Sequence, residues 1–173
     1  VEKVKIFDPN KDAIDSLSEW LSQVSPNLDL SVTSLEDACD ADVLITTTPV
    51  RKPVVMKDMV VRPHTHINAI GADAEGKQEV DGDLIKRCNV IVDDWTQTSH
   101  SGEINVPCHE GWFSKDMVAG EIGTIVALED SSFKDSLTLF DSTGLAIQDM
   151  ATANIVLEKA IEDGVGLDWS PLD

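Results

Sequence analysis

Residues 66–77, which read HINAIGADAEGK, decide the fold class of this chain. The run HINAI is short and largely apolar, and Gly71 ends it. A buried strand that stops at a glycine turn with polar residues behind it is typical of the carboxyl edge of a parallel sheet. Gly71 and Gly76 let the backbone turn tightly and approach a ligand closely.

Working outward, similar strand-like runs alternate with amphipathic segments along the chain. The strand-like runs are residues 4–7, 28–32, 42–47, 66–70, 90–92 and 137–140, and the helical segments are residues 12–24, 34–38, 81–87, 120–128 and 146–163. This alternation predicts an α/β fold, a Rossmann-like doubly wound parallel sheet with helices on both faces.

The composition narrows the class of partner. The chain has 173 residues, 42% of them hydrophobic, and a formal net charge of -19. We expect no nucleic acid and no membrane as partner, because both favour a basic surface. The acidity fits either adaptation to high salt or an ordinary solubilising surface. Three widely spaced cysteines, no apolar run of about 20 residues and no visible secretion signal favour a cytoplasmic protein.

Asp8 follows the first strand-like run. A carboxylate at this place accepts hydrogen bonds from the ribose hydroxyls of a dinucleotide, and it favours NAD over NADP because it repels a 2'-phosphate. The alternative is a simple turn, since Asp-Pro-Asn is a common turn sequence. Lys11 lies close enough to leave NADP open.

A dinucleotide fold places G-x-G-x-x-G about 20 residues before such an acid. Only seven residues precede Asp8, and none of them is glycine. The expectation is therefore a sheet that lacks its first strand and its glycine-rich loop, together with the pyrophosphate donors at the start of the first helix.

Two further segments carry candidate chemistry. Asp73 lies between two glycines, where a carboxylate can act as a general acid or base, and Lys77 lies four residues later. Both also fit a solvated turn with a helix cap. Ser142 and Thr143 follow the last strand-like run and can cap the long helix or face a nicotinamide amide.

Other chemistries find little support in the pattern. The four histidines, His64, His66, His100 and His109, have no nearby Cys or carboxylate at a metal-ligand spacing, so we expect no metal site. No serine lies in a G-x-S-x-G elbow, which disfavours a hydrolase triad.

Several segments together resemble the ornithine cyclodeaminase/mu-crystallin family, which includes archaeal-type alanine dehydrogenases. The segments are DVLITTTP (42–49), HINAIGADAEGKQE (66–79), VIVDD (90–94), SGEINVP (101–107) and LFDSTGLAIQD (139–149). The resemblance implies a partial NAD(P)-binding domain over residues 1–143. It also implies that residues 144–173 are a helix and tail returning to a substrate and dimerisation domain, and that the protein is a homodimer.

Carried over position by position, the resemblance implies a catalytic role for Asp73. It implies cofactor contacts for Asp8, Thr47, Thr48, Pro49, Asn68, Ala69, Gly71, Lys77 and Ser142. The substrate-binding Arg, Lys and Glu of the family come from its N-terminal half, so no position of this chain receives them.

The activity implied first is that of an NAD-dependent ornithine cyclodeaminase, which converts L-ornithine to L-proline and ammonia through hydride transfer and an imine. An alanine dehydrogenase or ketimine reductase of the same family is an alternative, and a non-enzymatic cofactor-binding or dimerising module is another. The substrate is an amino acid or imine, and we expect this chain to be inactive when it is alone.

Overall fold

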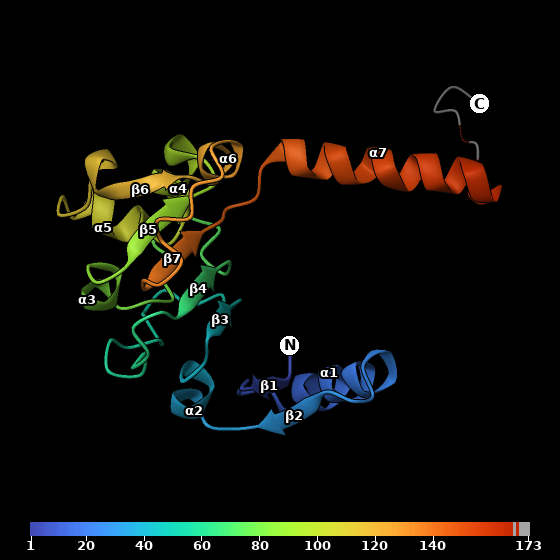
Figure 1. Cartoon of the computed structure of the whole chain (residues 1–173), viewed down its shortest axis with the longest axis horizontal. Coiled ribbons are helices and arrows are strands. Elements are labelled where there is room, and N and C mark those ends of the chain that lie inside the picture. The colour runs from blue at the N-terminus through green and yellow to red at the C-terminus, as the bar shows by residue number, and fades with distance from the viewer. Residues whose placement is uncertain (168, 170–173) are drawn as a thin grey trace. The chain divides into compact units, whose positions relative to one another are not determined.

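Five parallel strands form the larger of two sheets in the computed structural model, which describes residues 1–167 and residue 169. Their order across the sheet is β3-β4-β7-β5-β6, so the last strand of the chain lies between two earlier ones (Figure 1). This arrangement confirms the predicted Rossmann-like α/β fold. The strands are β3 (Val43–Thr46), β4 (His66–Ala69), β5 (Asn89–Val92), β6 (Val118–Glu121) and β7 (Thr138–Asp141).

The register brings the carboxyl ends of these strands to one edge. Thr46 lies opposite Ala69, and Asp141 lies opposite both Ala69 and Val92. The loops after β3, β4, β5 and β7 therefore open on the same side of the sheet, where ligands bind in folds of this kind.

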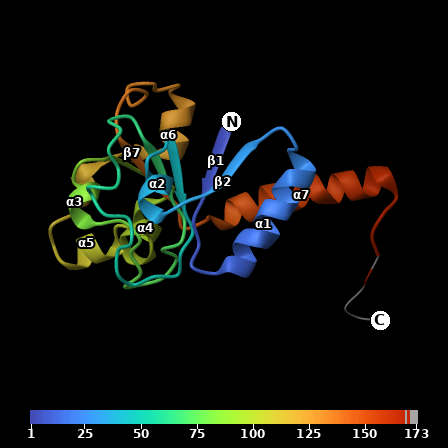
Figure 2. The ribbon, with the colours of Figure 1, turned by 90° about the horizontal axis from the view of Figure 1, so that it is seen from below.

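A second, smaller sheet holds β1 (Lys3–Ile6) and β2 (Asp29–Val32), which pair in parallel. Helix α1 (Lys11–Val24) is the crossover between them (Figure 2). Lys5 joins this sheet to α2 (Leu35–Cys39), because its ammonium donates to the carbonyl oxygens of Asp37 and Asp40. Among the described residues no ladder connects β1 with β3, so each of these strands has one unpaired edge.

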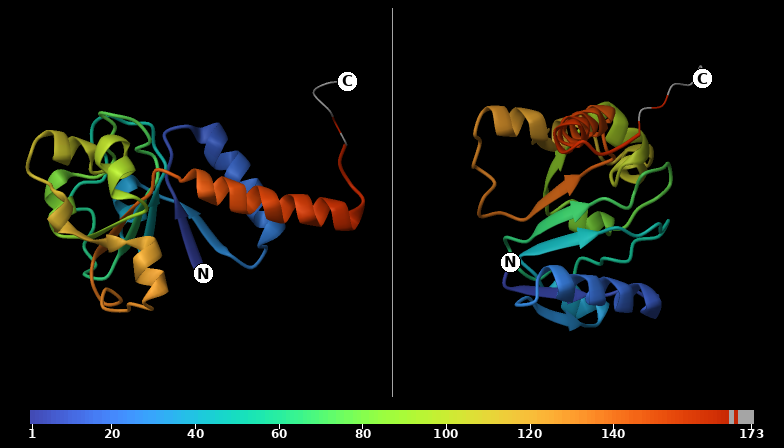
Figure 3. Two further views of the ribbon diagram at one scale, coloured as in Figure 1. Left: turned by 90° about the horizontal axis from the view of Figure 1, so that it is seen from above. Right: turned by 90° about the vertical axis from the view of Figure 1, so that its right-hand side faces the viewer.

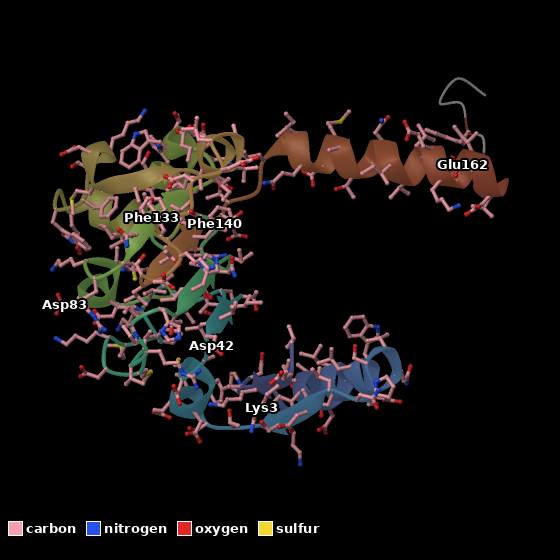
Figure 4. All side chains as sticks on the ribbon, in the orientation of Figure 1. Lys3, Asp42, Asp83, Phe133, Phe140 and Glu162 are labelled. Carbon is pink, nitrogen blue, oxygen red and sulfur yellow. The ribbon has the colours of Figure 1, made fainter. Side chains whose placement is uncertain are left out.

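The two faces of the five-stranded sheet differ in burial, because successive side chains of a strand point to opposite faces. One face is packed, with Leu44, Ile67 and Leu139 all buried. The other face is open at β3, where the exposed fractions of Val43 and Ile45 are 55% and 64%. Phe140 (labelled in Figure 4) pairs in register with Asn68, which in turn pairs with Ile45 on this open face.

Short elements account for most differences from the sequence predictions. The predicted helix 81–87 is only α3 (Gly82–Ile85), and the predicted helix 120–128 begins at Ile122 as α6 (Ile122–Ala127). Residues 118–121 form strand β6 instead, because they pair with β5. This strand was not predicted, because Gly120 lowers the strand propensity of the segment. Helices α4 (Trp95–Ser101) and α5 (Asn105–His109) were not predicted, because segments this short cannot show the helical period of apolar residues.

The chain divides into two compact units, residues 1–143 and residues 144–173. The second unit contains α7 (Ala146–Asp163), the long helix in Figure 3, with the bounds that the sequence predicts. The helix ends at Gly164, whose φ of 64° suits glycine. Residues 168 and 170–173 of the predicted second domain lie outside the described residues, and its membership of a dimerisation domain stays a prediction.

Apolar side chains on α7 are largely exposed. They are Ile147, Met150, Ile155, Val156, Leu157 and Ile161. Charged residues lie between them, and among the described residues no helix has the length and hydropathy needed to cross a bilayer.

Candidate functional site

Three loops at the carboxyl edge hold most of the residues that the sequence singles out. Thr47, Thr48 and Pro49 follow β3, and the loop from Gly71 to Lys77 follows β4. Ser142 follows β7, the neighbour of β4. Asn68 and Ala69 are the last two residues of β4. The fold therefore brings these loops to neighbouring positions on one edge, although they are distant in the sequence.

Asp73 and Lys77 form an ion pair across four residues. The side chain of Asp73 is 62% exposed and that of Lys77 is 21% exposed. The hydrogen bond from Lys77, helped by its positive charge, lowers the pKa of Asp73 below its usual value. Asp73 is therefore ionised at neutral pH, which suits a proton acceptor or a stabiliser of nearby positive charge.

Asn105 holds the turn that contains this pair. Its Oδ1 accepts from the backbone N–H of Gly76 at 2.8 Å, and its Nδ2 donates to the carbonyl of Lys77 at 2.8 Å. The φ of Gly76 is 76°, a left-handed value that a glycine adopts without strain. Asn105 lies in the segment SGEINVP (101–107) but was not predicted as a site residue, because it has no local signature of this role.

Glu79, a second site residue that was not predicted, accepts hydrogen bonds from both Thr48 and Gly71. The Thr48 hydroxyl donates to the Glu79 carboxylate at 2.7 Å, so only the lone pairs of that hydroxyl remain for a ligand. A Cβ on Gly71 would overlap the Thr48 backbone and the Glu79 carboxylate. Gly71 is therefore needed for close approach of two loops, a packing role beside the predicted cofactor contact.

Ser142 and Thr143 bond to Asp93 at the end of β5. The Ser142 hydroxyl donates to Asp93 Oδ2 at 3.2 Å, and the Thr143 N–H donates to the same oxygen at 2.8 Å. The predicted capping of the long helix by these residues is wrong, because its N-cap is Leu145 and no side chain caps it there. The Ser142 hydroxyl and the Thr143 N–H donate to the carboxylate of Asp93 instead.

Asp8 lies at the end of β1, in the smaller sheet. Its Oδ1 accepts from the backbone N–H of Asn10 at 2.6 Å, which is the turn that the sequence offered as the alternative. Asn10 in turn caps α1 through its side-chain oxygen. Asp8 is exposed, and its contact with ribose stays a prediction.

Two buried acids lie beneath the loops. Burial raises the pKa of Asp141 to about 7, against the opposing effect of hydrogen bonds from the backbone of Glu103 and Ile104. Burial likewise raises the pKa of Glu103 well above its usual value. Both side chains have an exposed fraction of 0%.

The thiols offer no reactive nucleophile in the described part of the chain. Cys39, Cys88 and Cys108 are free. Burial raises the pKa of Cys39 to about 11 and that of Cys88 to about 12, so both are protonated at neutral pH. No group of three His, Cys, Asp or Glu side chains is placed to hold a metal ion among the residues that the structure describes.

Comparison with known proteins identifies the family of this chain. A model of the ornithine cyclodeaminase/mu-crystallin family matches residues 1–164. The chain belongs to this family. The family resemblance seen in segments 66–79 and 139–149 is thus confirmed, and the ornithine cyclodeaminase/mu-crystallin match covers both compact units in large part.

Relatives within the ornithine cyclodeaminase/mu-crystallin family have several activities. The chain is 43% identical to the alanine dehydrogenase of Archaeoglobus fulgidus over 96% of this chain and 51% of that protein. It is 34% identical to the iminosuccinate reductase of Paracoccus denitrificans over 95% of this chain and 51% of that protein. An ornithine cyclodeaminase of Brucella abortus is 28% identical over 95% of this chain and 45% of its own length. The chain spans about half the length of these curated relatives.

Solved structures of relatives have the same fold. An archaeal alanine dehydrogenase dimer with bound NAD superimposes with a TM-score of 0.88 and 40% identity, covering 99% of this chain and 53% of that one. The Delta(1)-pyrroline-2-carboxylate reductase of Thermococcus litoralis, in complex with NADH and L-proline, has a TM-score of 0.88 and 31% identity, covering 97% and 53%.

Proposed function

We propose that this chain is the NAD-binding part of an enzyme that interconverts an amino acid and its imine. The observation that carries the proposal is the gathering of the loops after β3, β4 and β7 at one sheet edge, with the ionised Asp73–Lys77 pair on the β4 loop. Relatives of the same fold that were solved with NAD or NADH support it.

The polar groups at this edge suit a dinucleotide. The amide of Asn68 has no hydrogen-bond partner among the described residues, and Thr47 is exposed. Ser142 donates to Asp93 but retains acceptor lone pairs. Such uncharged groups match the hydroxyl and amide groups of NAD. The chain contains no G-x-G-x-x-G, so these residues supply no glycine-rich pyrophosphate loop.

Asp73 is the group that handles the proton in this proposal. When bound, NAD supplies the acceptor for the hydride that leaves the α-carbon of the amino acid. Asp73, held ionised by Lys77, would stabilise the positive charge of the iminium that hydride loss from the substrate amine leaves. It would accept the proton released when water or an amine then adds to that iminium. Lys77 helps to keep the carboxylate in place, because the Lys77 side chain is itself only 21% exposed.

The finer activity rests on pocket residues rather than on this edge. Oxidation of alanine with NAD is our first candidate, supported by 43% identity to an alanine dehydrogenase. Ornithine cyclodeamination, the first prediction from the sequence, is the second candidate, supported by 28% identity to an ornithine cyclodeaminase. A homodimer is also part of the proposal, because the archaeal alanine dehydrogenase was solved as a dimer.

The test uses the natural polypeptide that carries this sequence. NAD binding is measured by calorimetry, and NADH formation is then followed with alanine, aspartate, proline and ornithine as substrates. Alanine dehydrogenase activity predicts NADH with alanine, whereas cyclodeamination predicts proline and ammonia from ornithine without net NADH. Binding of NAD without turnover of any substrate would favour the non-enzymatic module, and absence of NAD binding would contradict the proposal.

A further inference from the structure

The carboxylate of Glu79 is fully buried between the loops that follow β3 and β4. From the end of β3 it accepts a hydrogen bond from Thr46 Oγ1 at 2.7 Å, and from the loop after β3 it accepts Thr48 N at 2.5 Å and Thr48 Oγ1 at 2.7 Å. From the second loop it accepts the backbone N–H of Gly71 at 2.8 Å. The exposed fraction of Glu79 is 0%.

These four bonds use the whole capacity of the group. A carboxylate has two oxygens with about four acceptor sites, and each Glu79 oxygen here receives two donors. Among the described residues no cation pairs with Glu79. Its burial is therefore offset by directional bonds to two loops, and not by an ion pair.

A packing role alone does not explain this arrangement. An apolar side chain of similar volume fills such a space without the desolvation cost of a carboxylate. What an apolar side chain cannot do is fix the relative position of Thr48 and Gly71, because dispersion contacts have little directionality. The carboxylate instead sets both backbone segments by bonds of defined length.

The position of Glu79 is itself fixed from the sheet. The carboxylate of Glu103 accepts the backbone N–H groups of Glu79 and Val80, at 2.9 and 2.6 Å. The carboxylate of Asp141 accepts the backbone N–H groups of Glu103 and Ile104, at 2.9 and 3.0 Å. Asp141 is the last residue of β7, so a series of buried carboxylates connects the sheet to the loops.

We infer that Glu79 is a positioning residue for the cofactor, one that fixes the loops after β3 and β4, which carry the predicted NAD contacts Thr48 and Gly71. The inference rests on the proposed function, because it assigns a role within that NAD site. Glu79 contacts no cofactor itself, since its acceptor sites are already used. It acts through Thr48 and Gly71.

Glu79→Gln tests the inference in the natural polypeptide that carries this sequence. Glutamine keeps the size of the side chain but has one acceptor oxygen, so its NH₂ group faces N–H or O–H donors that lose their acceptor. We expect the Kd and KM for NAD to rise about tenfold, the equivalent of one lost charge-assisted hydrogen bond, while kcat at saturating NAD falls less than about threefold.

Thr65→Val is the control, since Thr65 is also fully buried and its hydroxyl donates to the carbonyl of Ala41, at the opposite edge of the sheet from the two loops. Both variants lower the melting temperature, but only Glu79→Gln shifts NAD binding when measured well below both melting points. Equal NAD binding by Glu79→Gln and wild type would overturn the inference. An equally large shift in Thr65→Val would overturn it too, because the effect would then belong to the fold in general.

A milder pair of variants covers the case in which Glu79→Gln does not fold. Thr46→Val removes one donor to Glu79, and Thr46→Ser retains the hydroxyl. We expect a raised Kd for NAD in Thr46→Val and a normal Kd in Thr46→Ser, and equal values in both would contradict the inference. If the wild-type polypeptide binds no NAD, both the proposed function and the inference about Glu79 fail. If wild type binds NAD and the variants bind it equally well, only the inference about Glu79 fails.

Discussion

Asp73 is the candidate catalytic residue, and its ion pair with Lys77 and its ionised state both follow from the structure. It is exposed, ionised and paired with Lys77, and it lies on the loop that follows β4. Both residues were predicted as site residues from the sequence, and the structure shows that they form an ion pair. The lowered pKa keeps Asp73 ionised in its resting state, so it can accept a proton, although as a weaker base than an ordinary carboxylate.

Replacing this carboxylate tests its role. Asp73→Asn preserves the shape but cannot accept the proton, so we expect kcat to fall at least about 100-fold while the Kd for NAD changes little. Asp116→Asn is the control, because Asp116 is also exposed with a pKa lowered by hydrogen bonding, but lies on a 3₁₀ turn away from these loops. Steady-state turnover and NAD titration measure the two effects. Turnover of Asp73→Asn near that of wild type would exclude the proton-relay role.

Asp141 gives a prediction about pH. Its folded pKa is about 7, raised by burial above the usual 3.8, with Glu103, Asp93, Glu79 and Cys108 as the groups that face it. The folded state therefore binds this proton more tightly than the unfolded state does. The resulting stability is fully present below about pH 4 and is lost as the pH rises through about 7.

The difference between wild type and Asp141→Asn isolates this effect. Asparagine does not titrate, so the stability of wild type relative to the variant should fall between about pH 4 and 7, by a few kcal/mol at most. Asp83→Asn should show the opposite slope, because Lys86 and Lys57 lower the pKa of Asp83. Urea unfolding at several pH values measures the free energies. Parallel pH profiles for wild type and Asp141→Asn would show that Asp141 titrates normally.

At the scale of elements, α1 is a helix that the sequence defines well. Asn10 caps it by accepting from the backbone N–H of Asp12 at 3.0 Å and of Ala13 at 3.4 Å. The predicted segment 12–24 differs from the observed helix by one residue at its start. Amphipathic spacing over fourteen residues and a capping side chain are local signals, so the prediction required no tertiary information.

The cap provides a test of that element. Asn10→Ala removes both bonds, and we expect a loss of about 1 kcal/mol of unfolding free energy. Asn27→Ala is the control, because Asn27 is exposed and its side chain makes no hydrogen bond with the described residues. Chemical unfolding followed by circular dichroism compares them. Equal losses in the two variants would mean that the Asn10 bonds contribute nothing to stability.

Other elements had no such local signal. Strand β6 contains Gly120, which lowers strand propensity, and it forms through pairing with β5. Helices α4 and α5 have seven and five residues, too few to show a helical period. The donors of Ser142 and Thr143 were expected at a helix cap, but Asp93 from another strand accepts them. In each case a partner distant in sequence decided the local structure.

For the whole molecule, the open face and unpaired edge of β3 are the main exposed apolar features of the five-stranded sheet. Val43 and Ile45 are more than half exposed there, on a strand that pairs only with β4. An unpaired edge with apolar side chains favours association. We therefore expect the 173-residue chain by itself to self-associate with rising concentration, despite its net charge of -19.

The double variant Val43→Thr and Ile45→Thr should weaken this association, since threonine keeps the β-branched shape but adds a hydroxyl. Val126→Thr serves as the control, because Val126 is 67% exposed on α6 and outside the sheet. Sedimentation equilibrium over a range of concentrations gives the association constants. Unchanged association in the double variant would place the contact elsewhere.

The sequence by itself determined the α/β class, the positions of the longer strands and helices, the family, and Asp73 and Lys77 as candidate residues. These depend on local patterns, which are the period of the apolar residues and the polar residues that follow each strand. Only the tertiary structure decided that β7 lies between β4 and β5, and that Glu79, Glu103 and Asp141 hold the loops. Their hydrogen bonds join residues 24, 31 and 38 positions apart. A buried carboxylate of this kind has no local signature, because most of the partners of these three acids are backbone N–H groups, which every residue except proline carries.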